Sequence, residues 1–545
     1  MPHRLLATRI IALATLGSGL LNLYSVVGPP LPERARVLRG IFPLEFMHVA
    51  RFITLLAGFA LVVVSFNVYK RKRRAFTAAV ALACLSAGFH LTKGLDYVAA
   101  LFSISLLIAL LVWRKEFTVK SSFPAFRDSA VKLLIVLGLT LAYGVIGFWL
   151  LDKREFGIDF SLRQSIWSVA SLLQFAPETD LRPHTAHARW FLDSFYLITA
   201  VAILYGAGVF FRPIVYRYRI QPHDQKRARD LTIRFGRTSL DFFKYWPDKS
   251  YYFSASARAF IAYKVGASVA VVLGDPVGPP DDIHQVTVAF LAFCEENDWI
   301  PVFYQTTSEY LMVYGAAGLH KLKIGEDAIV ELDKFSLVGK DAKRVRNKIH
   351  HLEKSGIHTV SYDIPVPDHV LSQAKAVSDN WLHIPGRRER TFALGMFEWN
   401  YVKHTPLVAV VDAADQMVAF ANVIPSYVPG EATVDLMRHR TDAPNGTMDY
   451  LFVKLFLHSR EQGFKRFSLG MAPMSGFREN EEAAPEERAV HYFFQRMSFI
   501  FSYAGLLHYK AKFADVWEPR YMIYRHVLDL PRVALALAKV SELTR

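Results

Sequence analysis

The stretch VDLMRHRTDAPNGTMDYLFVKLFL, residues 434–457, joins an apolar strand-like segment to an apolar-faced helix through a polar and basic loop. Apolar side chains recur on one face of the predicted helix, namely Met448, Leu451, Phe452, Leu455 and Phe456. Gly463 is well placed to end this helix, because glycine adopts the left-handed conformation that helix C-termini favour. The sequence therefore predicts a strand, a loop and a helix in direct succession.

The loop of this unit carries the residues of chemical interest. Asn445 or Thr447 can supply the N-cap oxygen, and Asp449 falls in the first turn, where a negative charge is favourable. Free backbone N–H groups at a helix N-terminus suit an anionic or polarised ligand atom. The alternative is a capped turn with solvated arginines, in which Asn445 and Asp449 serve only the helix cap.

The same alternation of strands and helices extends over the chain from about residue 225 onwards, which indicates an α/β or α+β domain. Strands are predicted at 268–273, 301–305, 407–411, 417–424, 432–437 and 465–469, and the three from 407 to 437 are expected to be antiparallel. Further helices are predicted at 283–296 and 342–354. This length suits two modules, which we place at 216–360 and 361–545.

Residues 1–215 differ in character and are expected to form a transmembrane domain of five or six helices. Apolar runs occur at 10–27, 46–69, 76–91, 98–113, 131–151 and 191–211. The basic loop at 70–74 should face the cytoplasm, which places the C-terminal domain in the cytoplasm as well. The arginines at 34, 36 and 39 do not fit this orientation, since it leaves them outside.

Positive charge is the other global feature, with a formal net charge of +15. The segment 212–229 follows the last apolar run and can attract anionic lipid headgroups or RNA. The predicted helix at 342–354 gathers basic side chains that can follow RNA phosphates, contact anionic lipid or simply face solvent: Lys343, Arg344, Arg346 and Lys348.

The cysteine and histidine residues predict neither a metal site nor a disulfide. The chain has only two cysteines, Cys84 and Cys294, so neither a disulfide framework nor a cysteine zinc site is predicted. The histidines do not form a credible metal cluster, and no cofactor is expected.

Six segments together resemble the aminoacyl-phosphatidylglycerol synthases, the multiple peptide resistance factor or phosphatidylglycerol lysyltransferase family, in a short form. They are GDPVG at 274–278, FYQ at 303–305, DLMRH with PNGTMDYLF within 435–452, LGMAPMSG at 469–476, YKAKFADVWEPRY at 509–521 and HLTKGLDYVAA at 90–100. The resemblance covers nearly the whole chain.

The resemblance implies a tandem acetyltransferase-like (GNAT-like) fold and a multi-pass protein of the inner membrane. It further implies that the enzyme transfers an aminoacyl group, lysyl or alanyl, from aminoacyl-tRNA to phosphatidylglycerol and so raises resistance to cationic peptides. The loop at 438–447 lacks the glycine-rich phosphate cradle that acetyltransferases use for coenzyme A, so another acyl donor fits better.

The resemblance also places Asp435, Arg438 and Lys510 at the catalytic centre. It implies that Asp435 orients an ammonium or deprotonates the lipid hydroxyl, that Arg438 holds phosphate or balances the carboxylate, and that Lys510 neutralises an oxyanion. Lys512 joins the substrate-binding candidates. Positions three apart in a regular strand face opposite ways, so Asp435 and Arg438 share a cleft only if the strand bends between them.

Two rival functions stay open at this point. One is a tRNA- or coenzyme A-dependent acyltransferase acting on another membrane-associated acceptor, and the other is a membrane transporter or sensor without enzymatic activity. The longest relatives carry additional N-terminal spans, so we expect synthesis with membrane anchoring rather than complete lipid flipping. The transferred amino acid and the oligomeric state are not predicted.

Overall fold

The structure, a computed structural model, describes residues 2–27, 44–94, 97–117, 119, 138, 140–150, 156–158, 160–173, 181, 183–209, 222–340, 342–473, 475 and 503–542. The chain divides into two compact units. The first comprises Met1–Val215 with Glu295–Asp298, and the second comprises Tyr216–Cys294 with Trp299–Arg545. The division near residue 215 lies where the composition of the sequence changes.

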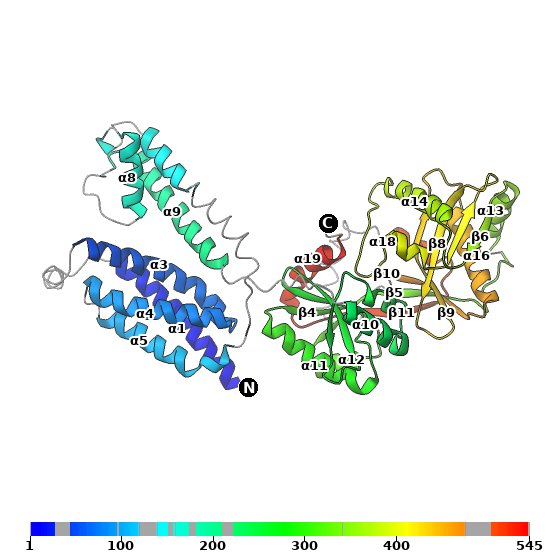
Figure 1. The fold of residues 1–545 in the computed structure, drawn as a ribbon, viewed down its shortest axis with the longest axis horizontal. Coiled ribbons are helices and arrows are strands. Elements are labelled where there is room, and N and C mark those ends of the chain that lie inside the picture. The colour runs from blue at the N-terminus through cyan, green and yellow to red at the C-terminus, as the bar shows by residue number, and fades with distance from the viewer. Residues whose placement is uncertain are drawn as a thin grey trace. The chain divides into compact units, whose positions relative to one another are not determined.

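The described part of the first unit is built of helices (Figure 1). Its longer helices are α1 (Pro2–Val27), α3 (Leu44–Tyr69), α4 (Arg73–Gly94), α5 (Tyr97–Val112), α8 (Leu162–Leu173) and α9 (Ala186–Val209). None of the helices in the described ranges combines the length and the apolar composition that a bilayer crossing requires. The predicted spans are therefore not confirmed, and the predicted run at 131–151 and the basic segment at 212–229 lie partly outside the described residues.

One continuous sheet of eleven strands organises the second unit, in the order β1-β2-β3-β4-β11-β5-β10-β9-β8-β7-β6. The strands are β1 (Ser250–Phe253), β2 (Phe260–Gly266), β3 (Val269–Leu273), β4 (Ile300–Thr306), β5 (His320–Glu331), β6 (His358–Tyr362), β7 (Leu407–Val411), β8 (Met417–Pro425), β9 (Glu431–His439), β10 (Arg466–Pro473) and β11 (Val516–Tyr524). The α+β class predicted for this part of the chain is confirmed.

The sheet repeats one topology in its two halves. In the first half β1, β2 and β3 are antiparallel neighbours, and helix α11 (Pro280–Glu296) connects β3 to the parallel strand β4. In the second half β7, β8 and β9 are antiparallel, as predicted, and helix α16 (Thr447–Glu461) connects β9 to the parallel strand β10. The two halves are thus built on the same plan.

The last strand of each half is exchanged. β5 follows β4 in the chain but pairs with β10, whereas β11 follows β10 but pairs with β4. β5 and β11 also pair with each other in the middle of the sheet. The two halves, which the sequence placed in modules at 216–360 and 361–545, therefore share a single hydrogen-bonded sheet.

Helices cover both faces of the sheet, and each helix packs on apolar residues of the strands beneath it. In the second half, α16 and α13 (Lys343–Lys354) pack on one face with α18 (Tyr503–Lys510), as the core around Leu352, Phe456 and Tyr509 shows. The other face is covered by α14 (Asp368–Leu382) and α15 (Trp399–Lys403). In the first half, α11 and α12 (Leu311–Ala316) cover one face, and η2 (Ser239–Tyr245) and α19 (Leu530–Ser541) cover the other.

Candidate active site

A β-bulge in β9 brings the two nominated ionisable residues of that strand to one face. Phe420 of β8 lies opposite Arg438, whereas Val423 lies opposite Val434, so β9 contains one residue more than β8 over this interval. An extra residue shifts the alternation of side chains by one position. Asp435 and Arg438 consequently both face the side of the sheet that α14 and α15 cover, which meets the condition set by their spacing.

The bulge is held by a buried amide. The side-chain oxygen of Asn422 accepts a hydrogen bond from the backbone N–H of Leu436 at 2.8 Å, and its nitrogen donates to the Thr405 hydroxyl at 3.1 Å. Asn422 is fully buried. A backbone N–H that loses its partner in the ladder needs another acceptor, and Asn422 supplies it.

Asp435 is buried and held by two donors. Its carboxylate accepts from the Gly395 backbone N–H at 3.0 Å and from the Tyr401 hydroxyl at 2.6 Å. Any Cβ at position 395 would lie 1.9 Å from the Asp435 carboxylate, so only glycine allows this approach. Burial raises the pKa of Asp435 to about 6, although both hydrogen bonds and Arg438 oppose the rise. A carboxylate with this pKa can accept a proton near neutral pH.

Arg438 is committed to an ion pair. Its guanidinium donates to both oxygens of Glu389, each at 2.7 Å, and to the Ser378 hydroxyl at 2.5 Å. The cation also lies 4.9 Å from the ring centre of Trp381. These contacts fix a buried positive charge beside Asp435 and leave the guanidinium with limited capacity to bind a lipid phosphate.

Lys510 lies in a different polar cluster. Its ammonium donates to the carbonyl oxygens of Gly470 at 3.0 Å and Met471 at 2.9 Å. The pairing of β10 with β9 ends at Ser468, so these carbonyls lie beyond the ladder that the two strands form. Burial lowers the pKa of Lys510 to about 8, and Asp327 opposes the shift.

The expectation that all three candidates meet at one centre is only partly met. Among the described residues, no hydrogen bond or ion pair joins Lys510 to Asp435 or Arg438. Two of the ammonium's three N–H groups are used by backbone carbonyls, which leaves one for another acceptor.

The loop before α16 differs from the predicted cap. Gly446 is the N-cap residue with φ of +95°, so the prediction of Asn445 or Thr447 was wrong. Asn445 is exposed, and the Thr447 hydroxyl donates to the Pro444 carbonyl at 2.6 Å. The local sequence Pro-Asn-Gly favours a tight turn ending in a left-handed glycine, which explains the difference.

Asp449 does lie in the first turn of α16, where it is buried and ion-paired. Its carboxylate lies 3.1 Å from the Lys348 ammonium and 3.6 Å from that of Lys512. These two lysines are therefore neutralised in part. On the same helix as Lys348, Lys343, Arg344 and Arg346 are exposed, and Arg346 also donates to the Leu337 carbonyl.

Several residues at the site had not been singled out from the sequence: Ser378, Trp381, Glu389, Gly395, Tyr401 and Asn422. They come from a region, 378–422, that contains no motif. One signal was present, since Glu389 is the single acid within the basic run GRRER at 386–390. Within the described ranges, no group of three or more histidine, cysteine, aspartate or glutamate side chains is arranged to hold a metal ion.

Comparison with known proteins gives a consistent result. Residues 229–524 match the family model described as "Phosphatidylglycerol lysyltransferase, C-terminal". A phosphatidylglycerol lysyltransferase of Bacillus subtilis is 29% identical over 521 residues, which are 94% of this chain and 57% of that protein. One from Staphylococcus epidermidis is 29% identical over 64% of this chain and 42% of its own length. The chain thus spans about half the length of these curated relatives.

Two solved structures resemble the second unit. The structure of L-PGS from Bacillus licheniformis is 31% identical with a TM-score of 0.52, covering 58% of this chain and 95% of that one. The C-terminal domain of a putative lysylphosphatidylglycerol synthetase from Agrobacterium fabrum is also 31% identical, with a TM-score of 0.53 and coverage of 58% and 96%. In both cases, nearly all of the solved chain is matched by a little over half of this one.

Proposed function

The chain belongs to the phosphatidylglycerol lysyltransferase C-terminal family, and on this premise we propose that it transfers an aminoacyl group, lysyl or alanyl, from aminoacyl-tRNA to phosphatidylglycerol. The observation that carries the proposal is the buried Asp435 on the bulged strand β9, held beside Arg438 in the second half of the sheet. The repeated strand plan further supports a tandem acetyltransferase-like fold.

The reaction needs few groups, because the ester of an aminoacyl-tRNA is already activated. In the proposed step Asp435 accepts the proton of a lipid glycerol hydroxyl while that oxygen attacks the ester carbonyl carbon. The bond to the tRNA ribose oxygen then breaks, and the proton passes to that oxygen. A base whose pKa lies near the working pH suits both directions of this transfer.

The neighbours of Asp435 support it in this role. The Tyr401 hydroxyl and the Gly395 N–H orient the carboxylate, and Arg438 stabilises its ionised form through the fixed charge that Glu389 and Ser378 position. The third N–H of Lys510 is the group that we assign to the developing oxyanion, because a preformed donor in a buried site stabilises such charge strongly.

The α16 N-terminus favours tRNA over coenzyme A as the carrier. Asp449 places its own carboxylate in the first turn, where an anionic ligand would otherwise bind, and Lys348 lies over Gly446. This arrangement disfavours a pyrophosphate at the position. The exposed basic residues of α13 are the surface that we assign to the tRNA acceptor stem.

Membrane location is part of the proposal. We propose that the apolar helices of the first unit attach the protein to the inner membrane, with the second unit in the cytoplasm at the inner leaflet. Adding lysine or alanine to phosphatidylglycerol lowers the negative surface charge and so weakens attraction of cationic peptides.

The proposal is tested by extracting lipids from bacterial cells that express the chain or its Asp435→Ala variant. A new ninhydrin-positive phospholipid is expected only with the unchanged protein, and a panel of charged tRNAs with phosphatidylglycerol vesicles then identifies the amino acid. An unchanged lipid profile in cells that contain folded protein would favour transfer to another membrane-associated acceptor or a non-enzymatic role.

A further inference from the structure

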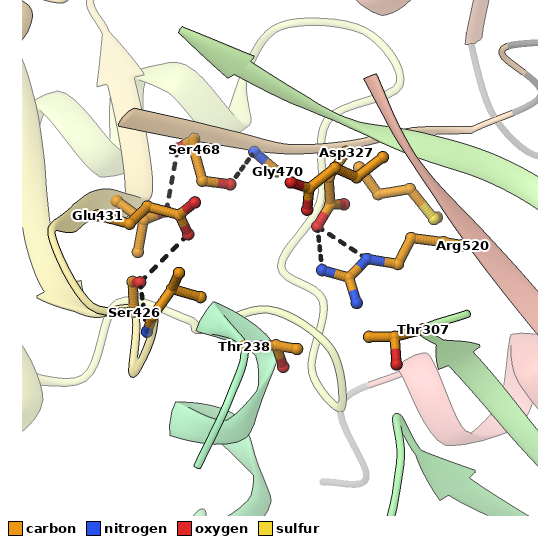
Figure 2. A network of polar contacts seen from close by, with 12 residues as sticks. Thr238, Thr307, Asp327, Ser426, Glu431, Ser468, Gly470 and Arg520 are labelled. Carbon is orange, nitrogen blue, oxygen red and sulfur yellow. Dashed lines mark hydrogen bonds and ion pairs between the residues drawn. The ribbon is translucent and has the colours of Figure 1, made fainter. Parts of the chain in front are cut away.

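A second buried polar cluster lies where strands from both halves of the sheet approach one another. Figure 2 shows Glu431 and Ser426 on one side of a space and Asp327 with Arg520 on the other. Thr238, Thr307, Ser468 and Gly470 complete the surroundings. The exchanged strands β5 and β11 supply Asp327 and Arg520, so neither half could build this cluster alone.

Glu431 is a buried carboxylate with weak compensation. One of its oxygens accepts from the Ser426 hydroxyl at 3.2 Å, and the other lies 3.5 Å from the Arg466 guanidinium. Arg466 is bound more closely by Glu518, at 2.5 Å. Burial raises the pKa of Glu431 to about 7, Arg466 and Ser426 oppose the rise, and the charges of Glu518 and Asp327 add to it. The carboxylate would gain from a further cation.

Arg520 presents the complementary feature. Its Nε and Nη2 both donate to one oxygen of Asp327, at 2.9 and 2.5 Å. Its Nη1 is buried and has no hydrogen-bond partner among the described residues, and the residue as a whole is only 7% exposed. In Figure 2 the nitrogen without a dashed line points away from Asp327, toward the space between Thr238 and Thr307. A buried donor of this kind calls for an acceptor that a ligand or water supplies.

We propose that this space binds the aminoacyl group of the donor, with Glu431 accepting hydrogen bonds from an ammonium and Arg520 Nη1 donating to an acyl oxygen. The proposal rests on the proposed function, because it names the subsite for that reaction's donor. An ammonium and a carbonyl oxygen occur together in every aminoacyl ester. A phosphate fits poorly, since Glu431 and Asp327 would repel it.

The cluster is continuous with Lys510. The N–H of Gly470 donates to the Ser468 hydroxyl at 3.2 Å, and the carbonyl of the same glycine accepts from Lys510. Asp327, which accepts both hydrogen bonds of Arg520, is also the charge that opposes the lowering of the Lys510 pKa, so we assign the aminoacyl group and Lys510 to one polar region. This continuity gives Lys510 a place in the reaction although it does not contact Asp435.

The test measures binding of amino acid esters to the full-length protein in detergent by calorimetric titration, without lipid or tRNA. Lysine methyl ester carries two ammonium groups, whereas norleucine and alanine methyl esters carry only the α-ammonium. In the Glu431→Gln variant we expect at least about tenfold weaker binding, the value of a charge-assisted hydrogen bond. A loss for all three esters assigns Glu431 to the α-ammonium, and a loss confined to lysine assigns it to the side chain.

Glu353→Gln is the matched control, because Glu353 also pairs with a basic side chain, that of Lys454 at 2.9 Å, but is far more exposed than Glu431 and, among the described residues, has no contact with the cluster. We expect its ester affinities to stay within about twofold of the unchanged protein. If Glu431→Gln folds poorly, Glu431→Asp takes its place in the test. This variant keeps the negative charge but shortens the side chain by one methylene, so its ester affinities should be intermediate. Thermal unfolding verifies the fold of each variant.

Two results would overturn the subsite: no ester binding by the unchanged protein, or equal affinities for it and folded Glu431→Gln. Lysyl transfer to phosphatidylglycerol is measured in parallel. Ester binding that depends on Glu431 without any transfer would refute the proposed function and leave the ammonium site standing. Transfer that depends on Asp435 without Glu431-dependent binding would refute the subsite alone.

Discussion

β3 and β9 occupy the same place in the two halves of the sheet, yet they differ in chemistry. Each is the last strand of an antiparallel run, β1 to β3 in the first half and β6 to β9 in the second, and each leads through a helix to a parallel neighbour. β3 reads VAVVL and is buried throughout, whereas β9 reads EATVDLMRH and buries Glu431, Asp435 and Arg438. The repeated topology therefore supplies the scaffold in both halves, and only the second half places ionisable groups in this strand.

The register of the two strands differs in the same way. β3 pairs with β2 without a shift, while β9 carries the bulge that Asn422 holds. A regular β9 would turn either Asp435 or Arg438 to the opposite face. The bulge and the charged residues thus belong together, which is typical of bulges near functional sites.

The largest effect should come from removing the base of β9. Asp435→Asn keeps the shape and one acceptor oxygen but cannot take up a proton, so kcat should fall by about 10²–10⁴-fold. The measurement is lysyl or alanyl transfer from charged tRNA to phosphatidylglycerol vesicles. In the first half, Asp275 is half-buried and accepts from Tyr314 and Thr307, so Asp275→Asn should lower stability rather than act on kcat directly. Near-normal turnover of the folded Asp435→Asn variant would show that β9 does not supply the catalytic base, and so that β9 does not differ from β3 in this respect.

Breaking the ion pair between Arg438 and Glu389 should lower both stability and activity, and a second substitution should separate the two effects. Arg438→Met leaves the Glu389 carboxylate without its partner, which should cost about 3–5 kcal/mol of unfolding free energy. Adding Glu389→Met removes the unpaired charge and should restore most of the stability. Transfer should stay low in both variants, because the positive charge beside Asp435 is absent. Recovery of activity in the double variant would show that the pair is only structural.

Glu431→Gln should stabilise the protein at alkaline pH. The folded-state pKa of Glu431 is raised to about 7, so folding binds a proton that the unfolded chain releases near its ordinary pKa of 4.5. Stability that Glu431 provides in its protonated form is therefore present at low pH and lost as pH rises from about 4.5 to 7. The variant should gain up to about 3 kcal/mol above pH ~7 and nothing near pH ~4. Equal unfolding temperatures of the two proteins at both pH values would contradict this expectation.

Much of the second half could be predicted from sequence because its elements are local. The predicted strand 407–411 agrees with β7, and the helix predicted at 342–354 agrees with α13 to within one residue. Continuous apolar runs and terminal glycines carry this information in the chain itself. β5 and β11 were not predicted, since HKLKIGEDAIVE and VWEPRYMIY mix charge, glycine and proline with apolar residues. Their exchange depends on pairing across the whole sheet.

The site was predictable only in part for a similar reason. Asp435, Arg438 and Lys510 were nominated through resemblance, and spacing alone argued against a shared face for the first two. The bulge that resolves the spacing depends on Asn422, which no local pattern connects to Leu436. Tyr401 and Glu389 reach the site from a segment without strands, so their role follows from tertiary packing. Glu431 and Arg520 lie in the same cluster only because β5 and β11 are exchanged between the two halves, which the local sequence does not show.

Lys510 should produce a smaller effect, visible as a pH profile. Its pKa lies at about 8, so the protonated fraction and the activity should fall about tenfold between pH ~7 and ~9. The guanidinium that the Lys510→Arg variant carries stays charged over this range, and the profile of that variant should lose the descending limb. Hydrolysis of the aminoacyl ester is measured in parallel without protein. The same limb in both proteins would show that Lys510 does not supply the charge.

The smallest effect is expected at the surface of the second half. Replacing Lys343 and Arg344 of α13 by glutamine should weaken tRNA binding a few-fold and reduce the slope of log affinity against log salt by about one to two. The matched control replaces Arg532 and Lys539, two exposed basic residues of α19, and should leave the slope unchanged. If both pairs of substitutions reduce the salt slope equally, the attraction of tRNA comes from net charge alone. The basic surface of α13 would then not be a specific tRNA-binding surface of the second half.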